Sequence, residues 1–571
     1  MYLSTLRVEG FRKLKLLELD LRPGLNVFVG PNNVGKTAVV DALRALLSST
    51  TEGALRVDES DLHVDADGNK VPYIQFGFVF RGLTEDEEAD FLTALKPSAT
   101  EPGKYEVCLS IRYTEPDAGG RLRPRRWCAD HPENVITIEM LESLSAIYLP
   151  PLRDPSSGLR PSRSSQLARL AVRLSNDETK KALVETLKTF DGELEKLAPV
   201  SQTQGAVTTR HEEMLGSSLM QALKVGLAPP DFNRLAARLS LLVESLDVEQ
   251  NGLGFNNLIF MAVVLSELST DPASSYKALI VEEPEAHLHP QLQAVLLDYL
   301  QSKETPEPGE SPVQVFVTSH SPHFASLAAL DTLGCIHQGA TEIRAFFPRT
   351  VGFEKAKKEK LQRYLDVTRA ALFFAKRIVL VEGTAELFVV SALARRLGIN
   401  LRKQSVSVLS TDGLNFDAFL PLFGESRLNV RVAVLTDSDP DGYPTLEEEL
   451  ASSDAAKAIA SMANTLVTPF FAKKTLEYDL ALHPENRSAM LKALGDLHPI
   501  IAKELELAVA TVPESERARE LYSGMFERGK GKTNVQKGAF GQALAQVLLS
   551  DEVSFVVPPY IGSALQHIVG T

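Results

Sequence analysis

A short segment near the start of the chain has the residue types and spacing that bind nucleotide phosphates. Residues 30–37 read Gly-Pro-Asn-Asn-Val-Gly-Lys-Thr and match G-x-x-x-x-G-K-[ST] in full. The segment follows an expected strand, Leu25–Val29, and precedes an expected helix, Ala38–Leu47. Backbone amides in such a loop and the positive end of the following helix attract phosphate. We therefore expect an ATP site in which Lys36 reaches the β- and γ-phosphates, Thr37 binds Mg²⁺, and Asn32, Asn33 and Gly35 shape the loop.

Two glutamates at the end of a later apolar run supply further groups that an ATPase needs. Residues 279–284 read Leu-Ile-Val-Glu-Glu-Pro. By its position, Glu282 is expected to bind Mg²⁺ through water, and Glu283 to polarise the attacking water. His320 follows the apolar run Val313–Val317 and is expected to sense the γ-phosphate, although a lone histidine is more often structural.

A glycine-rich segment before an expected helix suits phosphate binding from a second direction. Residues 250–257 read Gln-Asn-Gly-Leu-Gly-Phe-Asn-Asn, so Gly252 and Gly254 are the candidate contacts, and a simple helix-start turn is the alternative. His287 and His289 form a His-x-His pair. A zinc site is disfavoured there because no third and fourth ligands lie at suitable spacing.

Carboxylates at two further strand ends indicate a metal site. Glu382 follows the apolar run Arg377–Val381, and Glu386 lies in the first turn of the next expected helix. A second strand, Val430–Leu435, ends just before Asp437, and Asp439 follows. Acids at neighbouring strand ends converge on divalent cations. Two metals about 4 Å apart stabilise the attacking and leaving oxygens of a phosphodiester.

The second acidic segment also fits a calcium loop. Residues 437–448 match D-x-D-x-D-G-x₅-E, the EF-hand pattern. A β-branched strand precedes the segment where an EF-hand needs a helix, and Pro440 and Pro444 stiffen it. We therefore favour the strand-end metal site.

The order of the first set of motifs resembles the ABC ATPases, especially the DNA-repair and chromosome-maintenance branch. In that family two protomers sandwich two ATP molecules, which implies a dimer in which Gly252 and Gly254 act in trans. The glycine-rich segment departs from the family's Leu-Ser-Gly-Gly-Gln, which leaves the sandwich geometry open.

The carboxylate set resembles the Toprim fold of topoisomerases, primases, recombination mediators and OLD (overcoming lysogenization defect) nucleases. A primase would carry a zinc-binding cysteine cluster, and no segment indicates the nucleophilic tyrosine domain of a topoisomerase. The combination is similar to the OLD family and to Gabija-type anti-phage nucleases, on the blocks 148–154, 252–257, 382–386 and 475–478. The resemblance implies two-metal DNA cleavage. Glu382, Asp437 and Asp439 would be core ligands for Mg²⁺, Mn²⁺ or Ca²⁺, Glu386 and Glu477 would serve the second metal, and Lys537, with Lys532 as second choice, would supply a cation.

These sites need an α/β framework: an ABC-type P-loop ATPase domain with a helical insertion, then a Toprim (Rossmann-like) domain with a helical insertion. Leucines at helical spacing predict the first insertion, which is expected to serve dimerisation. A polar stretch, Ser201–Arg210, interrupts this run of leucines, and Lys355–Lys360 is expected to be a basic linker. The predicted boundaries are 1–160 and 246–365 for the ATPase, 161–245 for its insertion, and 370–571 for Toprim, with its insert at about 480–535.

Composition sets limits on partners and location. A net charge of −14 argues mildly against nucleic acid, yet basic runs occur at 121–126 and 355–363. Three scattered cysteines suit a reducing cytoplasm, and no apolar run approaches the roughly 18 residues of a membrane span. The predicted function is a DNA endonuclease or nickase in phage defence or DNA processing. It acts as a homo-oligomer on DNA, and a separately encoded helicase is a candidate partner. The alternative is an ATP-gated DNA-binding clamp whose Toprim module does not cleave.

Overall fold

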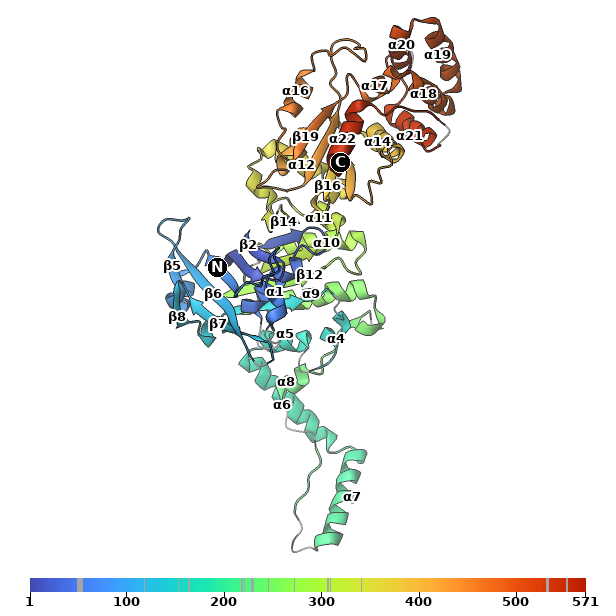
Figure 1. Cartoon of the computed structure of the whole chain (residues 1–571). Helices are drawn as coiled ribbons and strands as arrows, with labels where there is room; N and C mark the ends of the chain where they lie inside the picture. Colours follow the sequence, from blue (N-terminus) through green and yellow to red (C-terminus); the bar gives the residue numbers. More distant parts are fainter. Residues whose placement is uncertain are drawn as a thin grey trace.

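A computed structural model gives the fold of the chain. It describes residues 1–570 except 49–54, 118, 152–153, 163–164, 217–218, 220, 227–230, 245, 272, 306–307, 309, 340, 530–532 and 551–552. Two bodies are stacked along the long axis of the molecule, with a helical arm extending from the end formed by the first body (Figure 1). The chain is α/β throughout, and the fold class expected from the sequence is confirmed.

Two sheets form the first body. The outer, antiparallel sheet contains β2 (Leu14–Asp20), β1 (Tyr2–Phe11), β4 (Ile74–Arg81), β6 (Tyr105–Pro116), β7 (Leu122–Cys128) and β8 (His131–Val135), with β5 (Leu95–Pro97) paired to β6. The inner, mostly parallel sheet has the order β15 (Ile343–Phe346), β14 (Leu333–Gln338), β3 (Leu25–Val29), β13 (Gln314–Ser319), β12 (Tyr276–Glu282) and β9 (Leu144–Leu149). Only β15 runs antiparallel in the inner sheet.

Helices cover both faces of the inner sheet. One core joins α1 (Lys36–Leu47) to the outer sheet and to the Phe28, Ile280 and Phe316 face of the inner sheet. A second core packs α9 (Leu253–Ser269), α10 (Pro290–Ser302) and α11 (Pro322–Leu327) on the opposite face and continues into the second body. The shorter helices of this body are α2 (Glu85–Asp90), α3 (Ile138–Glu142), α12 (Lys355–Tyr364) and α13 (Val367–Ala370).

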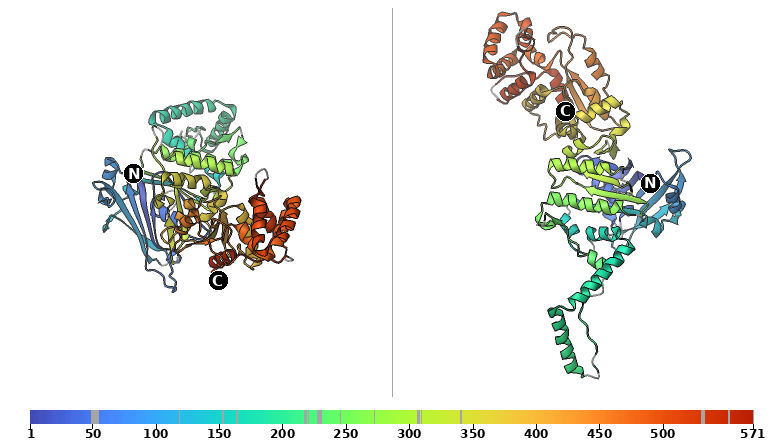
Figure 2. Two further views of the ribbon diagram at one scale, coloured as in Figure 1. Left: turned by 90° about the horizontal axis from the view of Figure 1, so that it is seen from above. Right: turned by 180° about the vertical axis from the view of Figure 1, so that it is seen from behind.

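The second body is a parallel sheet with helices on both sides. Its order is β17 (Val406–Ser410), β16 (Arg377–Val381), β18 (Arg431–Thr436) and β19 (Val467–Phe471). One face carries α14 (Thr384–Arg396), α17 (Leu476–Leu482), α21 (Lys537–Leu548) and α22 (Pro559–Val569). The helices α18 (Pro484–Leu497), α19 (Pro499–Thr511) and α20 (Glu514–Phe526) extend that core sideways (Figure 2), while α15 (Phe416–Phe419) and α16 (Asp454–Ala460) lie toward the other face.

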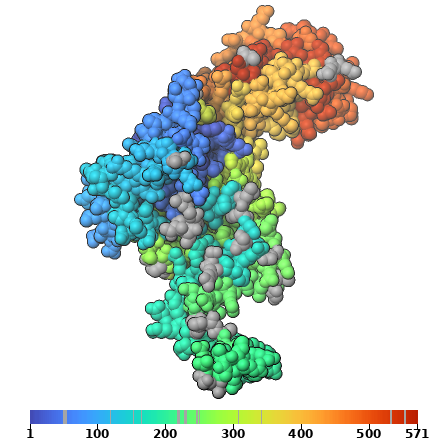
Figure 3. Space-filling view, turned by 60° about the horizontal axis from the view of Figure 1, so that its bottom comes forward, coloured from blue at the N-terminus to red at the C-terminus, as the bar shows by residue number. Residues whose placement is uncertain are grey.

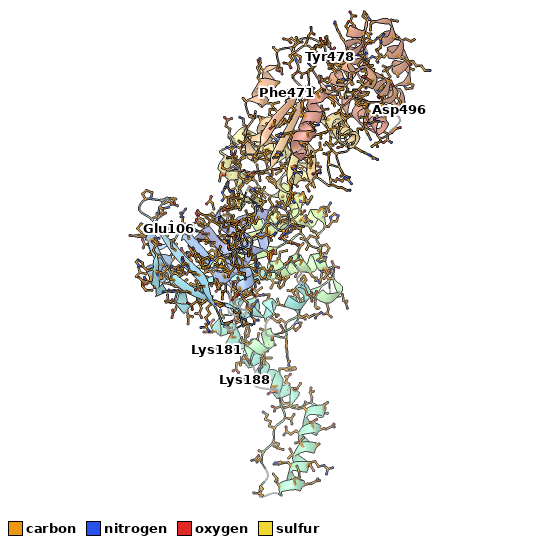
Figure 4. The ribbon with its side chains drawn as sticks, in the orientation of Figure 1. Glu106, Lys181, Lys188, Phe471, Tyr478 and Asp496 are labelled. Carbon is orange, nitrogen blue, oxygen red and sulfur yellow. The ribbon has the colours of Figure 1, made fainter. Side chains whose placement is uncertain are left out.

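The arm is the most exposed part of the described chain. It consists of α6 (Asp177–Leu194) and α7 (Ala198–Leu215), while α4 (Pro155–Leu159), α5 (Gln166–Leu174) and α8 (Phe232–Ala236) lie at its base, where α4 and α5 pack on α9. Neither α6 nor α7 has a buried residue, and Lys181 and Lys188 project from α6 into solvent (Figure 4). The space-filling view shows the arm as a projection separate from both bodies (Figure 3).

One sequence expectation about local structure is wrong, and one stretch without a leucine pattern is helical. The polar stretch Ser201–Arg210 lies inside α7, where hydroxyls such as that of Thr203 donate to backbone carbonyls one turn back. The segment Lys355–Lys360 is not a linker but the first part of α12, which Leu361 anchors in the core. In both helices the polar residues face solvent.

No helix in the described part of the chain combines the length and apolar character that crossing a lipid bilayer requires.

Candidate functional site

The P-loop connects β3 to α1, and its glycines hold backbone conformations that other residues rarely adopt. Gly30 has φ +151°, and a Cβ there would lie 2.1 Å from the carbonyl oxygen of Ile336, while Gly35 has φ +89°. The buried Lys36 donates from Nζ to the carbonyl oxygens of Gly30 (2.6 Å) and Pro31 (2.7 Å). Burial lowers the pKa of Lys36 to about 8, against the opposing effect of Glu283. The ammonium is therefore held within the loop that surrounds the phosphate position.

Parallel pairing brings the second half of this site to the same sheet edge. The strands β3, β13, β12 and β9 all end beside the P-loop. The hydroxyl of Thr37 donates to Glu282 Oε2 at 3.2 Å, and the Tyr148 hydroxyl donates to Glu282 Oε1 at 2.7 Å. Burial raises the pKa of Glu282. Thr37 and Glu282 thus lie together, as two ligands of one Mg²⁺ would.

A cavity of about 650 Å³ opens next to these groups. His320 Nε2 lies 3.3 Å from Glu283 Oε1, and Glu283 has φ +47°, a strained conformation that turns it out of β12. Burial lowers the pKa of His320. The cavity is lined by Arg12, Lys13, Asn32, Asn33, Gly35, Lys36, Thr37, Ala38, Glu283 and His320.

Two residues of this region were not expected from the sequence. Arg12 lines the cavity and forms ion pairs with Asp41 and Asp61, both at 2.7 Å. Glu285 is half-buried and accepts from the Ser319 hydroxyl (2.6 Å) and the His320 amide (3.1 Å), which fixes the backbone at the end of β13. Neither Arg12 nor Glu285 is part of a recognisable sequence motif, so their place in the site becomes visible only in the folded structure.

The glycine-rich segment lies away from the cavity of its own chain. Gly252 caps α9, and Gly254 lies in its first turn, where a Cβ would be 2.6 Å from the carbonyl oxygen of His287. Neither glycine lines the nucleotide cavity. His289 caps α10, where Nδ1 accepts from the Gln291 amide at 3.4 Å.

Four carboxylates gather at the carboxyl edge of the second sheet. Val381 and Leu435 are paired in β16 and β18, which places Glu382 beside Asp437. Glu382 Oε1 accepts from the Asp437 amide at 2.9 Å and from the Thr436 hydroxyl. Burial, together with the charges of Glu382 and Glu477, raises the pKa of Asp437 well above its ordinary value. The same causes, Glu477 foremost among the charges, raise the pKa of Glu386 to about 7.

A lysine from α21 completes this cluster. Lys537 Nζ lies 2.9 Å from Glu477 Oε2, and the Glu477 side chain is almost fully buried. The nearby carboxylates, Glu477 first, raise the pKa of Lys537 despite its burial. The other carboxylate oxygen of Glu477 has no hydrogen-bond partner in the described structure. The cluster therefore holds more buried negative charge than one lysine offsets.

Two predicted site residues are not brought into the cluster. Asp439 has φ +40° and is exposed, and its carboxylate makes no hydrogen bond or ion pair with the described residues. Lys532 lies outside the described residues. The strand β18 leads directly into the loop that contains Asp437 and Asp439, where an EF-hand would have a helix.

The cluster has the residue types that bind a divalent cation. Its side chains, however, are not arranged as ligands around one point. Among the described residues, no three histidine, cysteine or carboxylate side chains already form a metal-binding group. Instead Glu386 accepts from the Gly383 amide (3.1 Å), and Asp437 accepts from the Leu476 amide (3.1 Å). Oxygen-only ligands suit Mg²⁺, Mn²⁺ and Ca²⁺. The excess buried negative charge and the unpartnered oxygen of Glu477 are what such a cation would neutralise.

Comparisons with known proteins agree with this two-part organisation. An AAA ATPase domain family matches residues 1–108 and 152–325, and an Overcoming lysogenization defect protein-like TOPRIM domain family matches residues 373–439. The chain has the two-domain composition of the OLD proteins. The resemblance to OLD proteins inferred from its motifs is confirmed.

Individual relatives extend over different parts of the chain. An OLD nuclease of Thermus scotoductus is 24% identical over 444 residues, which are 72% of this chain and 77% of the relative. A DNA replication and repair protein RecF of Renibacterium salmoninarum is 39% identical over 77 residues, only 14% of this chain and 16% of the relative. Among solved structures, the C-terminal region of the Burkholderia pseudomallei OLD protein is 25% identical, with a TM-score of 0.25, and covers 34% of this chain and 98% of its own. The SMC head domain from Thermotoga maritima is 11% identical, with a TM-score of 0.30, and covers 60% and 98% respectively.

Proposed function

We propose that the chain is an ATP-binding, divalent-metal-dependent DNA endonuclease or nickase with a role in phage defence or DNA processing. The observation that carries the proposal is the carboxylate cluster with Lys537, which stands in one chain with a P-loop site. The OLD nuclease relative supports the same activity. We divide the chain as the sequence suggested: ATPase at 1–160 and 246–365, a helical insertion at 161–245, and Toprim at 370–571 with a helical insert at about 480–535.

In the nuclease site, Glu382, Asp437 and Asp439 would be the core ligands, with Glu386 and Glu477 for a second ion. The loop after Asp437 would have to rotate before the exposed Asp439 could join the other metal ligands. Bound metal would polarise the phosphodiester and lower the pKa of an attacking water. Lys537, held by Glu477, would place positive charge against the phosphate. A protonated Glu386, with its pKa near 7, is able to give up its proton when a cation arrives.

In the ATPase site, Lys36 would exchange the carbonyls of Gly30 and Pro31 for phosphate oxygens. Thr37 and Glu282 would hold Mg²⁺. Glu283 would orient and polarise the attacking water, and His320, 3.3 Å from Glu283, would sense the γ-phosphate. Asn32, Asn33 and Gly35 line the same cavity.

A dimer is part of the proposal. Gly252 and Gly254 lie off their own nucleotide cavity, so they are free to complete the site of a second copy. The arm carries apolar side chains that a single chain leaves in solvent, which favours a partner there. Exposed examples are Phe190, Leu197, Val207, Met214 and Leu215. DNA is the proposed substrate, a separately encoded helicase is a further candidate partner, and the cytoplasm is the proposed location.

Plasmid cleavage tests the proposal. With Mg²⁺ or Mn²⁺, the wild type should convert supercoiled plasmid to nicked or linear forms, and Asp437→Asn should not. Asp441→Asn is the matched control, because Asp441 lies in the same loop but is exposed. Equal cutting by wild type and Asp437→Asn, or no cutting under any metal or nucleotide condition, would contradict the nuclease proposal.

The alternative, an ATP-gated clamp, is favoured by one observation: the described carboxylates do not yet form a metal-binding group. A clamp would retain DNA in the presence of ATP, lose that retention in Lys36→Ala, and never cleave. Running the plasmid assay with Lys36→Ala, with and without ATP, separates the two functions.

A further inference from the structure

A second cavity, of about 670 Å³, lies between the ATPase and Toprim bodies. One wall is the P-loop, with Asn32 and Asn33, and the end of β14. The opposite wall is the amino edge of the Toprim sheet: the start of β16, the loop before β17 and the loop before β18. The labels β14 and β16 lie on either side of this junction in Figure 1. The carboxylate cluster lies at the other, carboxyl edge of the same sheet, so this cavity is a separate site.

The charge of the cavity is opposite to that of the whole protein. The chain carries a net charge of −14, yet four cations line the cavity: Lys13, Lys376, Arg377 and Lys403. No carboxylate is among its lining residues. None of the four cations forms an ion pair with the described residues, although Arg377 donates to Gln404. Unneutralised cations around a concave surface favour a multiply charged anion.

The floor of the cavity combines apolar side chains with one polar side chain, which a simple inorganic ion would not need. Phe373, Leu428 and Val430 are buried apolar side chains there. His337 also lines it, only 4% exposed; no well-formed hydrogen bond from the described residues reaches either ring nitrogen, although the backbone at Gln338 and Arg427 lies close enough to raise its pKa against the effect of burial. An unsatisfied buried polar group has a cost of roughly 1–3 kcal/mol and calls for a partner. A neutral imidazole offers one donor and one acceptor, which matches the polar edge of a nucleobase.

We infer that this cavity is a second nucleotide site, which binds a nucleoside di- or triphosphate. The phosphates would meet the cations at the rim, and the base would enter the apolar floor beside His337. A volume of about 670 Å³ lies within the usual range of roughly 300–1,000 Å³ for small-molecule sites. The site goes beyond the proposed nuclease activity and does not depend on it.

Its position connects it to both chemical centres, to the ATP cavity by shared residues and to the carboxylate cluster by a single strand. Lys13, Asn32 and Asn33 line this cavity and the ATP cavity alike. Arg377 lies at the first residue of β16, and Glu382 follows the last, so the strand spans roughly 17 Å between them at about 3.3 Å per residue. A bound nucleotide would therefore bridge the P-loop and the strand that presents Glu382.

Calorimetry on the full-length protein tests the inference. The Lys36→Ala background weakens the P-loop site, and the probe is ADP. We expect this background to retain about one ADP site per chain, with affinity at least tenfold weaker when Lys376→Glu and Lys403→Glu are added. The matched control adds Lys492→Glu and Lys503→Glu, which change the net charge equally on exposed faces of α18 and α19. The control should bind ADP as the background does, and all variants should share one melting temperature.

Three results would overturn the inference. The first is no ADP binding to Lys36→Ala, and the second is equal loss in both charge-reversed proteins. The third concerns the ligand: inorganic tripolyphosphate, or a short single-stranded oligonucleotide, binding at this site more tightly than ADP would show that no nucleotide is recognised. Because the readout is binding, failure here is separate from failure of the nuclease proposal.

Discussion

The contact between α14 and α21 offers a sharp test of how the carboxylate cluster is positioned. Gly541 in α21 faces Ala385 in α14, and a Cβ on Gly541 would lie 2.6 Å from Ala385 Cα and 3.0 Å from its carbonyl oxygen. Carbon atoms normally approach to about 3.5–4.0 Å. Because the clashing atoms are backbone, Gly541→Ala must move the two helices apart by about 1 Å.

The magnitude follows from two opposing effects. Alanine is favoured over glycine inside a helix by about 0.5–1 kcal/mol, whereas overpacking a close contact costs about 1–3 kcal/mol. We expect Gly541→Ala to lower the free energy of unfolding by about 1–2 kcal/mol, a fall of roughly 2–8 °C in melting temperature for a domain of this size. Lys537 begins α21 and Glu386 lies in α14, so cleavage should fall by about 100-fold from a 1 Å displacement.

Two glycine controls isolate the clash. A Cβ on Gly538, in the same helix, would meet Thr384 at an ordinary 3.6 Å, and one on Gly562 in α22 would meet nothing within 4 Å. Both alanine variants should be as stable as the wild type or slightly more stable. Calorimetric melting and the plasmid assay give the two readouts. If the Gly541→Ala protein has the same melting temperature as its two controls and cleaves plasmid at the normal rate, the predicted clash between α14 and α21 is refuted.

Three further predictions concern the ATPase body. Burial, reinforced by Arg344, lowers the pKa of His337, so the unfolded chain takes up a proton first and the free energy of unfolding should fall as the pH drops below about 6.5. His337→Phe should flatten that dependence in melts between pH 7.5 and 5.5; parallel curves would contradict it. Glu283→Gln should slow ATP hydrolysis about 10²–10⁴-fold while ATP still binds, measured by phosphate release and calorimetry, and an unchanged rate would exclude the role proposed for Glu283. Tyr148→Phe removes the hydroxyl that donates to Glu282 and should cost roughly 1–2 kcal/mol in a urea titration; an unshifted midpoint would show that this bond contributes nothing.

Sequence reasoning was strongest where the chemistry is local. The P-loop could be located residue by residue because its glycines, Lys36 and Thr37 are consecutive. Strand ends at Glu282, Glu382 and Asp437 could also be predicted, because buried parallel strands are continuous apolar runs whose carboxyl ends share one edge. The fold class followed from the same alternation of strands and helices.

Prediction from the sequence was weakest for residues that belong to no apolar pattern and no local motif. Helix α7 has no buried residue, so Ser201–Arg210 carries no periodicity to mark it as helical. Glu477 and Lys537 meet at 2.9 Å although 60 residues separate them; family resemblance suggested each residue singly, and no sequence signal indicated their contact. Asp439 looked equivalent to Asp437 in sequence, but its left-handed backbone turns it into solvent.

The arm and the second body, which contains the carboxylate cluster, lie at opposite ends of the molecule (Figures 1 and 2). If two copies join only through their arms, the proposed cleavage centres lie at the two far ends of the assembly, and each would act on its own stretch of duplex. Two nicks on one DNA would then be separated by many helical turns. If the ATPase bodies pair instead, both centres lie on one side, and closely spaced cuts in opposite strands become the expected product. The spacing of the breaks thus reports which surface holds the copies together.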